Sequence, residues 1–340
     1  MVRRKTVPAK TISIEDVARL AGVSITTVSR VINKFPSVKE KNRARVLDAV
    51  KQLKFQPSVL AQRLATGRSN VVALIIPRYE GVFYSFYALE LIRGIGTLCE
   101  ALKLDLLLHL TDSRTPLNLR GAGGIIFSDI ISNRQQLEDA LNSDTPCVVI
   151  NNYVEDLEVN CLAVDNTGGA ETAVNYLIGL GHKKIAHITG DVFTQAAAQR
   201  LEGYKRALKK NNIEIKEGYI FKTDYSRGQA RQATENLIKM LDQITAVFVA
   251  SDSMALEVMT VARELGKDIP RDLSIVGFDD NPSGLYGPVA LTTVRQPLIK
   301  MAEEGVKELN RLMNAKKKTP VKKILLPTEL VIRDSCRSFP

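Results

Sequence analysis

Seven residues near the amino terminus combine apolar, hydroxyl, amide and guanidinium side chains. An apolar side chain can touch a thymine methyl group, whereas hydroxyl, amide and guanidinium groups hydrogen-bond to base edges and phosphates. The seven residues are Ser24, Ile25, Thr26, Thr27, Ser29, Arg30 and Asn33. They fall within ten consecutive positions, which is the span of one short helix. The pattern predicts a helix that inserts into the major groove.

Two short helices and a tight turn would position these side chains. Ser13 and Asp16 form a capping-box pattern, and the apolar spacing that follows predicts a first helix over 14–21. Gly22 can adopt the positive φ that a sharp turn needs, and Ser24 can cap a second helix. This arrangement is typical of a helix-turn-helix, although an ordinary small helical bundle can show the same pattern.

Apolar residues on the inner faces would close a three-helix core. Those of the second helix are Val28, Val31 and Ile32. A third helix is predicted after a second capping box, formed by Ser37 and Glu40, and its core-facing residues are Val46, Leu47, Val50 and Leu53.

Positive charge is concentrated at the same end of the chain. Residues 1–70 contain fifteen Lys or Arg and four Asp or Glu, a net charge of +11, whereas the whole chain carries +10. The remaining 270 residues are therefore nearly neutral. Such a basic segment is expected of a protein that neutralises DNA phosphates and releases their counterions.

Residues 58–69 predict a short helix that Ser58 caps and Gly67 ends. Helices shorter than about 12 residues are marginal in water, so this one needs a surface on which to fold. It connects the basic segment to the rest of the chain.

Three motifs together resemble the lactose-repressor (LacI/GalR) family of bacterial transcription regulators. They are AGVS at 21–24, TVSRVIN at 27–33 and AQRLA at 61–65. The resemblance implies a homodimer on a pseudo-palindromic operator, with paired hinge helices in the minor groove. It places Leu64 between two base pairs and Ala61 beside it. Ser58 departs from the family, whose members usually carry Asn there, but both residues cap helices well.

The rest of the chain alternates apolar strands with helices, which predicts an α/β body of two doubly wound subdomains. Strands are predicted at 71–77, 104–110, 124–127, 147–151, 185–190, 246–251 and 273–280, and a helix at 169–180. The family resemblance implies a periplasmic-binding-protein-like clamshell with a ligand cleft between its lobes.

These patterns predict three segments: a helix-turn-helix domain at 1–57, a hinge at 58–70, and an effector-binding and dimerisation domain at 71–340. Within the last segment, chain crossings are expected near Val164, Thr292 and Leu326. The amino-terminal lobe would comprise 71–164 and 293–325, and the carboxy-terminal lobe 165–292 and 326–340.

Ligands of such sheets bind beyond the carboxyl ends of the strands. By family position, Arg200 and Asp279 resemble residues that bind sugar hydroxyls, with Ser251 and Asn151 as further polar contacts. Arg200 and Asp279 could instead simply pair with each other. Asp252 is expected to cap a helix. An aromatic face could come from Phe83, Tyr84, Phe86 and Tyr87, although these are as often core residues.

The segment between Asp112 and Gly124 departs from the family. It has 11 residues with a proline and two glycines, where the family has a full crossover helix. We expect the amino-terminal lobe to be trimmed on one side.

Other kinds of chemistry find little support. The four cysteines lack metal-ligand spacing, and the chain has no Walker loop, nucleophile elbow or dinucleotide fingerprint. We therefore expect no enzymatic activity, no metal and no cofactor. No stretch is as long as a membrane span and no apolar run follows the basic amino terminus, which predicts a cytoplasmic location without membrane contact.

The sequence thus predicts a DNA-binding transcription regulator, expected to be a repressor, whose operator affinity changes when a small sugar-like effector binds. Three alternatives stay open. A partner protein could replace the effector, the chain could be a sugar-binding receptor without a DNA role, or it could be an enzyme acting on a sugar.

Overall fold

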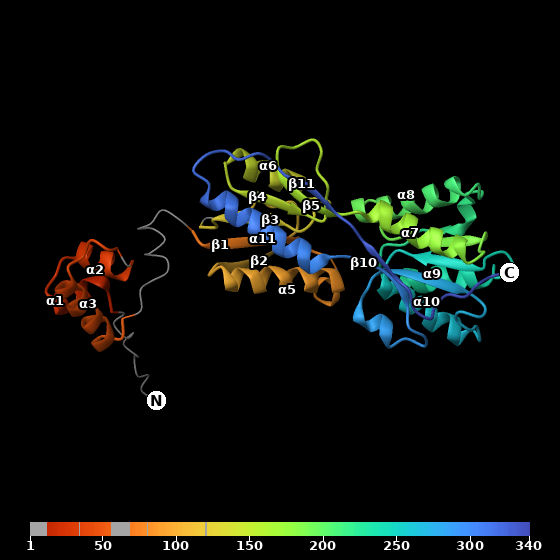
Figure 1. Ribbon diagram of the computed structural model, residues 1–340, viewed down its shortest axis with the longest axis horizontal. Coiled ribbons are helices and arrows are strands. Elements are labelled where there is room, and N and C mark those ends of the chain that lie inside the picture. Colours follow the sequence, from red (N-terminus) through yellow and green to blue (C-terminus); the bar gives the residue numbers. More distant parts are fainter. Residues whose placement is uncertain (1–11, 34, 56–68, 80, 120) are drawn as a thin grey trace, which may run out of the picture. The chain divides into compact units, whose positions relative to one another are not determined.

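The computed structural model describes residues 12–33, 35–55, 69–79, 81–119 and 121–340, which fall into two compact units divided at residues 70 and 71 (Figure 1). The first unit contains α1 (Ile14–Ala21), α2 (Ile25–Ile32) and α3 (Glu40–Gln52). The predicted hinge helix lies mostly outside the described residues.

The first unit confirms the predicted caps of its first two helices. The Ser13 side chain accepts a hydrogen bond from the backbone of Asp16, whose carboxylate accepts one from the Ser13 backbone. Gly22 has the left-handed φ of 59° that the turn requires, and Ser24 caps α2 by accepting from the backbone of Thr27. Seven buried residues form its core: Val17, Ala18, Ala21, Val28, Val31, Val46 and Ala49.

Two predictions about the third helix are wrong. The Ser37–Glu40 capping box does not form, because α3 begins at Glu40 and its N-cap residue, Lys39, makes no side-chain cap hydrogen bond. Leu47 points to solvent with 54% of its surface exposed, whereas Val46 next to it is fully buried. A helix turns by about 100° per residue, so these two neighbours cannot both face a core this small.

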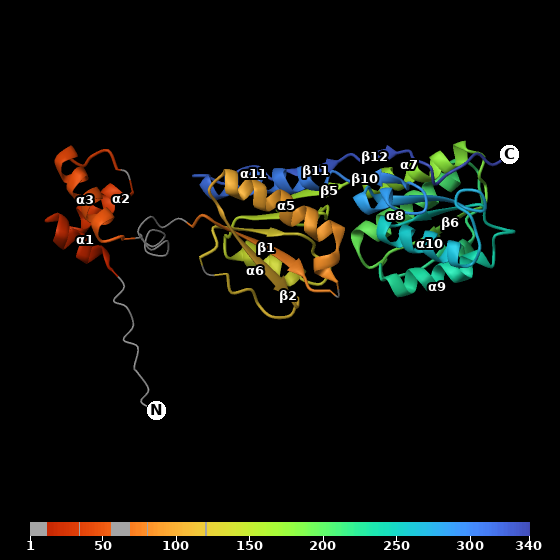
Figure 2. The same cartoon turned by 90° about the horizontal axis from the view of Figure 1, so that it is seen from below.

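The second unit contains two lobes, each built on a six-stranded sheet. The first sheet has the order β11-β5-β4-β3-β1-β2 and is parallel throughout. Its strands are β1 (Val71–Pro77), β2 (Asp105–Thr111), β3 (Gly124–Phe127), β4 (Cys147–Ile150), β5 (Asn160–Val164) and β11 (Lys323–Leu326). Helices α5 (Phe86–Ala101) and α11 (Leu298–Asn314) cover one face and α6 (Arg134–Asn142) the other (Figure 2). The short η1 (Val82–Tyr84) precedes α5.

The second sheet has the order β12-β10-β9-β8-β6-β7, and β12 alone of its described strands runs antiparallel. Its strands are β6 (Ile185–Ile188), β7 (Ile220–Phe221), β8 (Ala246–Val249), β9 (Ser274–Asp279), β10 (Thr292–Arg295) and β12 (Glu329–Val331). Helices α7 (Asn166–Gly179) and α8 (Gln195–Lys210) pack on one face, and α9 (Arg227–Ile238) and α10 (Asp252–Glu264) on the other. The elements η2 (Glu217–Tyr219) and η3 (Pro282–Leu285) lie in connections. The predicted fold class is confirmed.

The chain passes between the lobes three times. It leaves the first sheet after Val164, returns after β10, and leaves again after Leu326. The predicted second crossing at Thr292 is slightly early, because β10 pairs with both β9 and β12 as far as Arg295. Gln296 and the residues beside it therefore lie between the lobes.

The shortened segment 112–123 contains no helix among its described residues. Leu117, Leu119 and Ala122 pack against the same buried cluster as α6. The buried amide of Gln136 fixes the segment by donating to Thr111 Oγ1 at 2.8 Å and to the carbonyl oxygen of Thr115 at 2.6 Å. The segment is thus an irregular loop, as the sequence predicted, and its apolar side chains cover part of the buried cluster beneath α6.

Candidate DNA interface and effector site

Helix α2 presents an unpaired, partly apolar surface to solvent. Its valines, Val28 and Val31, are buried against α1 and α3, and this orients Ile25, Thr26 and Arg30 outward. Ile25 is 47% exposed although it is a large apolar residue. An exposed apolar side chain beside a hydroxyl and a guanidinium matches the mixture of groups on the edges of base pairs.

The other predicted contact residues of α2 are partly engaged within the helix. The hydroxyl oxygens of Ser24 and Thr27 lie 2.9 Å apart, and Asn33 Nδ2 donates to Ser29 Oγ at 3.4 Å. Ser24 is exposed, and Thr27, Ser29 and Asn33 are half-buried. The hinge residues Ala61 and Leu64 lie outside the described residues.

Two arginines of α3, which the sequence analysis did not single out, hold the turns on either side of α2. Arg45 Nη2 donates to the Gly22 carbonyl oxygen at 3.4 Å, and Arg43 Nη2 donates to that of Phe35 at 2.9 Å. They fix the ends of the recognition helix from behind. No local pattern in the sequence would predict this role for Arg43 and Arg45.

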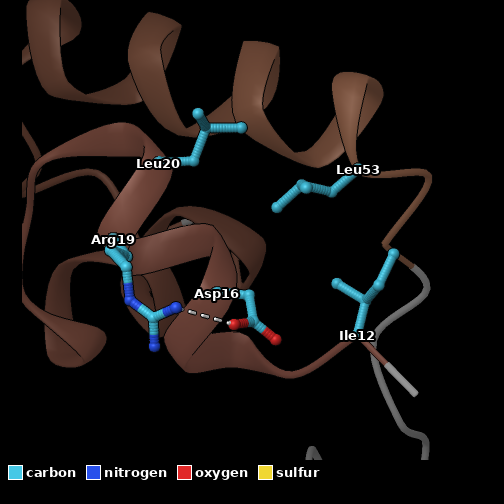
Figure 3. A pocket seen from close by; sticks show the side chains of 5 residues that line it. All are labelled: Ile12, Asp16, Arg19, Leu20 and Leu53. Carbon is cyan, nitrogen blue, oxygen red and sulfur yellow. Dashed lines mark ion pairs between the residues drawn. The ribbon is translucent and has the colours of Figure 1, made fainter. Parts of the chain in front are cut away.

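A surface pocket of the first unit lies on the α1 side, away from the predicted DNA contacts (Figure 3). Its lining residues are Ile12, Asp16, Arg19, Leu20 and Leu53. Arg19 Nη1 pairs with Asp16 Oδ1 at 3.3 Å within it. The pocket shares no residue with the exposed face of α2.

In the second unit, Arg200 of α8 is the main cationic group at the junction of the lobes. Its Nε donates to Asn166 Oδ1 at 2.9 Å and its Nη1 to the Ala250 carbonyl oxygen at 2.6 Å. The guanidinium carbon lies 3.8 Å from the centre of the Phe278 ring. These contacts hold a nearly buried cation in one orientation.

Asp279, at the end of β9, lies opposite Arg200. The distance from Arg200 Nη1 to Asp279 Oδ1 is 3.9 Å, a loose ion pair, and Gln296 Nε2 donates to the same oxygen at 2.6 Å. Burial raises the pKa of Asp279 to about 6, against the opposing effect of the Arg200 charge. The two predicted ligand residues are thus together, and they pair with each other only partly.

The prediction that Asp252 caps the following helix is wrong. Ser251 is the N-cap of α10 and accepts from the backbone of Met254. Asp252 is fully buried, and its carboxylate accepts from Thr293 Oγ1 at 2.6 Å and from the Asn281 backbone at 2.7 Å. It ties the end of β9 to β10, a long-range contact that no local pattern could reveal.

Asn151 follows β4 on the opposite lobe and has a left-handed φ of 70°. Its Nδ2 donates to Asp129 Oδ2 at 3.3 Å, and the Ile130 backbone donates to Asp129 Oδ1 at 2.8 Å. Burial raises the pKa of Asp129 to about 6. The sequence analysis missed Asp129, although it directly follows the strand β3 and Ser128.

The predicted aromatic face is not assembled as expected. Phe83 is 54% exposed on η1, and Phe86 packs against the core of the first lobe. Tyr87 donates its hydroxyl to the carbonyl oxygen of Ser128. The aromatic ring that does lie between the lobes is Tyr225, which follows β7.

Tyr225 is close to groups of both lobes. Burial raises the pKa of its hydroxyl, and the charges of Arg200, Asp279 and Asp129 all act on it. Its ring occupies the space that a side chain at Gly190 would need. Its φ of 69° is a left-handed conformation that a tyrosine rarely adopts, and such strain is often found at ligand sites.

A side chain also links the two lobes directly. Gln195, the first residue of α8, accepts from the Tyr153 backbone N–H at 2.7 Å and donates to the Tyr153 carbonyl oxygen at 3.0 Å. The pair of hydrogen bonds resembles one step of a strand ladder and requires the lobes to be close.

The part of the chain that the structure describes holds no group of three or more His, Cys, Asp or Glu suited to a metal ion. Its helices are also too short or too polar to cross a bilayer.

The chain is similar to known proteins along most of its length. Residues 13–58 match the family of bacterial regulatory proteins, lacI family, and residues 174–336 match the periplasmic binding protein-like domain. Catabolite control protein A of Priestia megaterium is 31% identical over 335 residues, which cover 96% of this chain and 99% of the relative. The probable HTH-type transcriptional repressor ExuR of Bacillus subtilis is 33% identical, with coverage of 96% and 98%.

Solved structures show the same architecture. A lac repressor dimer bound to operator and the anti-inducer ONPF has a TM-score of 0.81 at 25% identity, with 96% of this chain and 100% of that chain covered. A complex of the transcriptional regulator CelR with cellobiose has a TM-score of 0.70 at 27% identity, with coverage of 95% and 99%.

Proposed function

The chain belongs to the lacI family of bacterial regulatory proteins and is a DNA-binding transcription regulator, and we propose that it represses transcription as a homodimer on a pseudo-palindromic operator. In this proposal residues 1–57 bind the major groove, 58–70 form the hinge, and 71–340 bind effector and dimerise. A two-fold protein requires a two-fold operator.

The observation that carries the proposal is the exposed face of α2 in a segment of net charge +11. The charge supplies affinity for any duplex, and Ile25, Thr26 and Arg30 supply the base contacts that discriminate sequences. Ser24, Thr27, Ser29 and Asn33 complete the surface. Because Ile25 and Thr26 cannot form bidentate hydrogen bonds with a base, Arg30 carries most of the directional readout.

In this proposal the hinge residues contact DNA as well, in the minor groove. Leu64 would enter a base step in the minor groove with Ala61 beside it, and the bent duplex would regain the cost of a few kcal/mol through added contacts.

The effector is a sugar or a related metabolite. The solved relatives include complexes with cellobiose, ONPG and ribose. Arg200 and Asp279 offer donors and an acceptor in one place, and Asn151 lies across the junction. Ser251 acts by capping α10, and Phe83 would contact effector only at the rim. Effector binding changes operator affinity by its differential affinity for two arrangements of the lobes.

The test selects random duplexes on the purified full chain and measures the affinity of the enriched sequence by fluorescence anisotropy at several salt concentrations. We expect an inverted repeat and an affinity that falls steeply as salt rises. Arg30→Ala should weaken binding to the specific site by about 1–3 kcal/mol, or roughly five-fold to 150-fold. Arg206→Ala, which removes a remote exposed arginine from the second unit, is the matched control.

Leu64→Ala separates the hinge role from the charge. We expect it to reduce affinity for the selected operator much more than affinity for scrambled duplex. Equal losses on both would contradict the wedge, and failure to enrich any sequence would contradict the proposed function itself.

A further inference from the structure

Two hydrogen-bond acceptors at the junction of the lobes, Asp129 and Gln296, are not fully satisfied by the described residues. Asp129 accepts only from uncharged groups, namely the Ile130 backbone, Asn151 and Asn152. Among the described residues no Lys or Arg forms an ion pair with it. A carboxylate partly withdrawn from water without a cation is costly, so this group favours a positively charged partner.

The buried cation Arg200 lies on the other lobe and is already committed. Arg200 faces Asp279, donates to Asn166 and to the Ala250 carbonyl oxygen, and stacks on Phe278. Its charge therefore balances that of Asp279. Asp252 has both carboxyl oxygens occupied by Thr293 Oγ1 and the Asn281 backbone. The negative charge of Asp129 is left over.

A second acceptor at the junction also lacks a donor. Gln296 is 7% exposed and its Nε2 binds Asp279, while its Oε1 has no hydrogen-bond partner among the described residues. An unsatisfied buried acceptor calls for a donor-rich ligand in the same way as the unpaired carboxylate.

The two lobes hold these groups across from each other. Gln195 joins α8 to Tyr153, which is two residues from Asn151 and so fixes the loop that contacts Asp129. Tyr225 lies between, within reach of charges on both sides. A sugar ring against Tyr225 would place one substituent toward Asp129 and another toward Asp279.

We propose that the effector carries a protonated amine that binds Asp129, while its hydroxyl groups bind Asp279, Arg200 and Gln296; amino sugars and aminated polyols have this chemistry. The inference rests on the proposed function and narrows its effector class. An acidic sugar would place two negative charges side by side at Asp129 and is rejected.

The test compares sugars that share a ring and differ in charge. Titration calorimetry at pH 7.5 uses the full chain with glucosamine, glucose and glucuronate, and then with the three galactose counterparts. We expect the amine of at least one series to bind ten-fold or more tightly than its neutral counterpart, and the acids to bind more weakly still.

Asp129→Asn keeps the side-chain shape and removes the charge, so it should abolish the preference for the amine while neutral sugar binding persists. Asp156→Asn, an exposed carboxylate of the same lobe that pairs with Arg134, is the matched control and should leave the preference unchanged.

The inference is overturned if no amine binds, if in neither series the amine binds more tightly than the neutral and acidic sugars, or if Asp129→Asn keeps the preference. Operator binding measured on the same samples separates this failure from failure of the regulator function, since the latter would abolish specific DNA binding as well.

Discussion

Individual residues at the lobe junction divide into those that bind ligand and those that position them. Asp252 is more deeply buried than Asp279, and its two carboxyl oxygens accept hydrogen bonds from Thr293 Oγ1 and the Asn281 backbone. Asp279, whose φ of 130° is rare for a non-glycine residue, is held in place by the segment that Asp252 ties down. The carboxylate that meets ligand is thus oriented by one that does not.

Effector binding should weaken as the pH falls through about 6. Burial raises the pKa of both Asp129 and Asp279 to about 6, so acidification protonates the acceptors that a ligand needs. The tyrosines around Asp129, namely Tyr79, Tyr87 and Tyr225, have pKa values raised above 10 and stay neutral. The check is the effector affinity from calorimetry between pH 5 and pH 8.

The sign for stability is the opposite. A carboxyl whose folded pKa lies above its unfolded value of 3.8 binds its proton more readily in the folded state, so these two groups favour folding as the pH falls from 6 toward 4. Protonation of Asp129 and Asp279 can be monitored by the NMR signals of their carboxyl carbons. If effector affinity falls between pH 6 and pH 4 while both groups stay ionised, their protonation does not cause the loss of affinity.

At the scale of elements, the turn between α1 and α2 sets the direction of the recognition helix. Gly22 has positive φ, and the Arg45 guanidinium lies where a side chain at this position would begin. The buried valines of α2 then decide which of its faces points outward. An error in the turn would therefore misdirect Ile25, Thr26 and Arg30 together.

Gly22→Ala should destabilise the first unit by about 1 kcal/mol, because a Cβ disfavours the left-handed conformation. Amide hydrogen exchange in α1 and α2 should become roughly five-fold faster. Gly179→Ala in α7 has no neighbouring atom within 4 Å of the added carbon and serves as the control, with exchange unchanged or slower. Equal protection of α1 and α2 in Gly22→Ala and the parent would contradict the role of the turn.

At the scale of the whole molecule, two lobes joined by three chain crossings can change their separation while each core stays intact. The Gln195 side chain forms two hydrogen bonds to the Tyr153 backbone in the other lobe. Such a link stabilises the closed arrangement and reduces the free energy that an effector must supply to close it.

Gln195→Ala should therefore populate an open arrangement, seen as a larger radius of gyration in small-angle X-ray scattering and as weaker effector binding. Gln229→Ala, which breaks a hydrogen bond to Asp224 within one lobe, should change neither. An unchanged radius in Gln195→Ala would show that the crossings alone hold the lobes together.

Local signals were enough to predict the helix-turn-helix, because helix caps, a turn glycine and apolar spacing all act between residues close in the chain. The same holds for the buried strands. The resemblance to the LacI/GalR family placed Arg200 and Asp279 in one site, and the structure brings their side chains to 3.9 Å. Tertiary structure alone decided that Asp252 is buried, that Leu47 is exposed, and that Asp129, Tyr225 and Gln195 meet across the lobes. Each of these depends on contacts between residues distant in the chain, which hydrophobic periodicity and capping patterns do not encode.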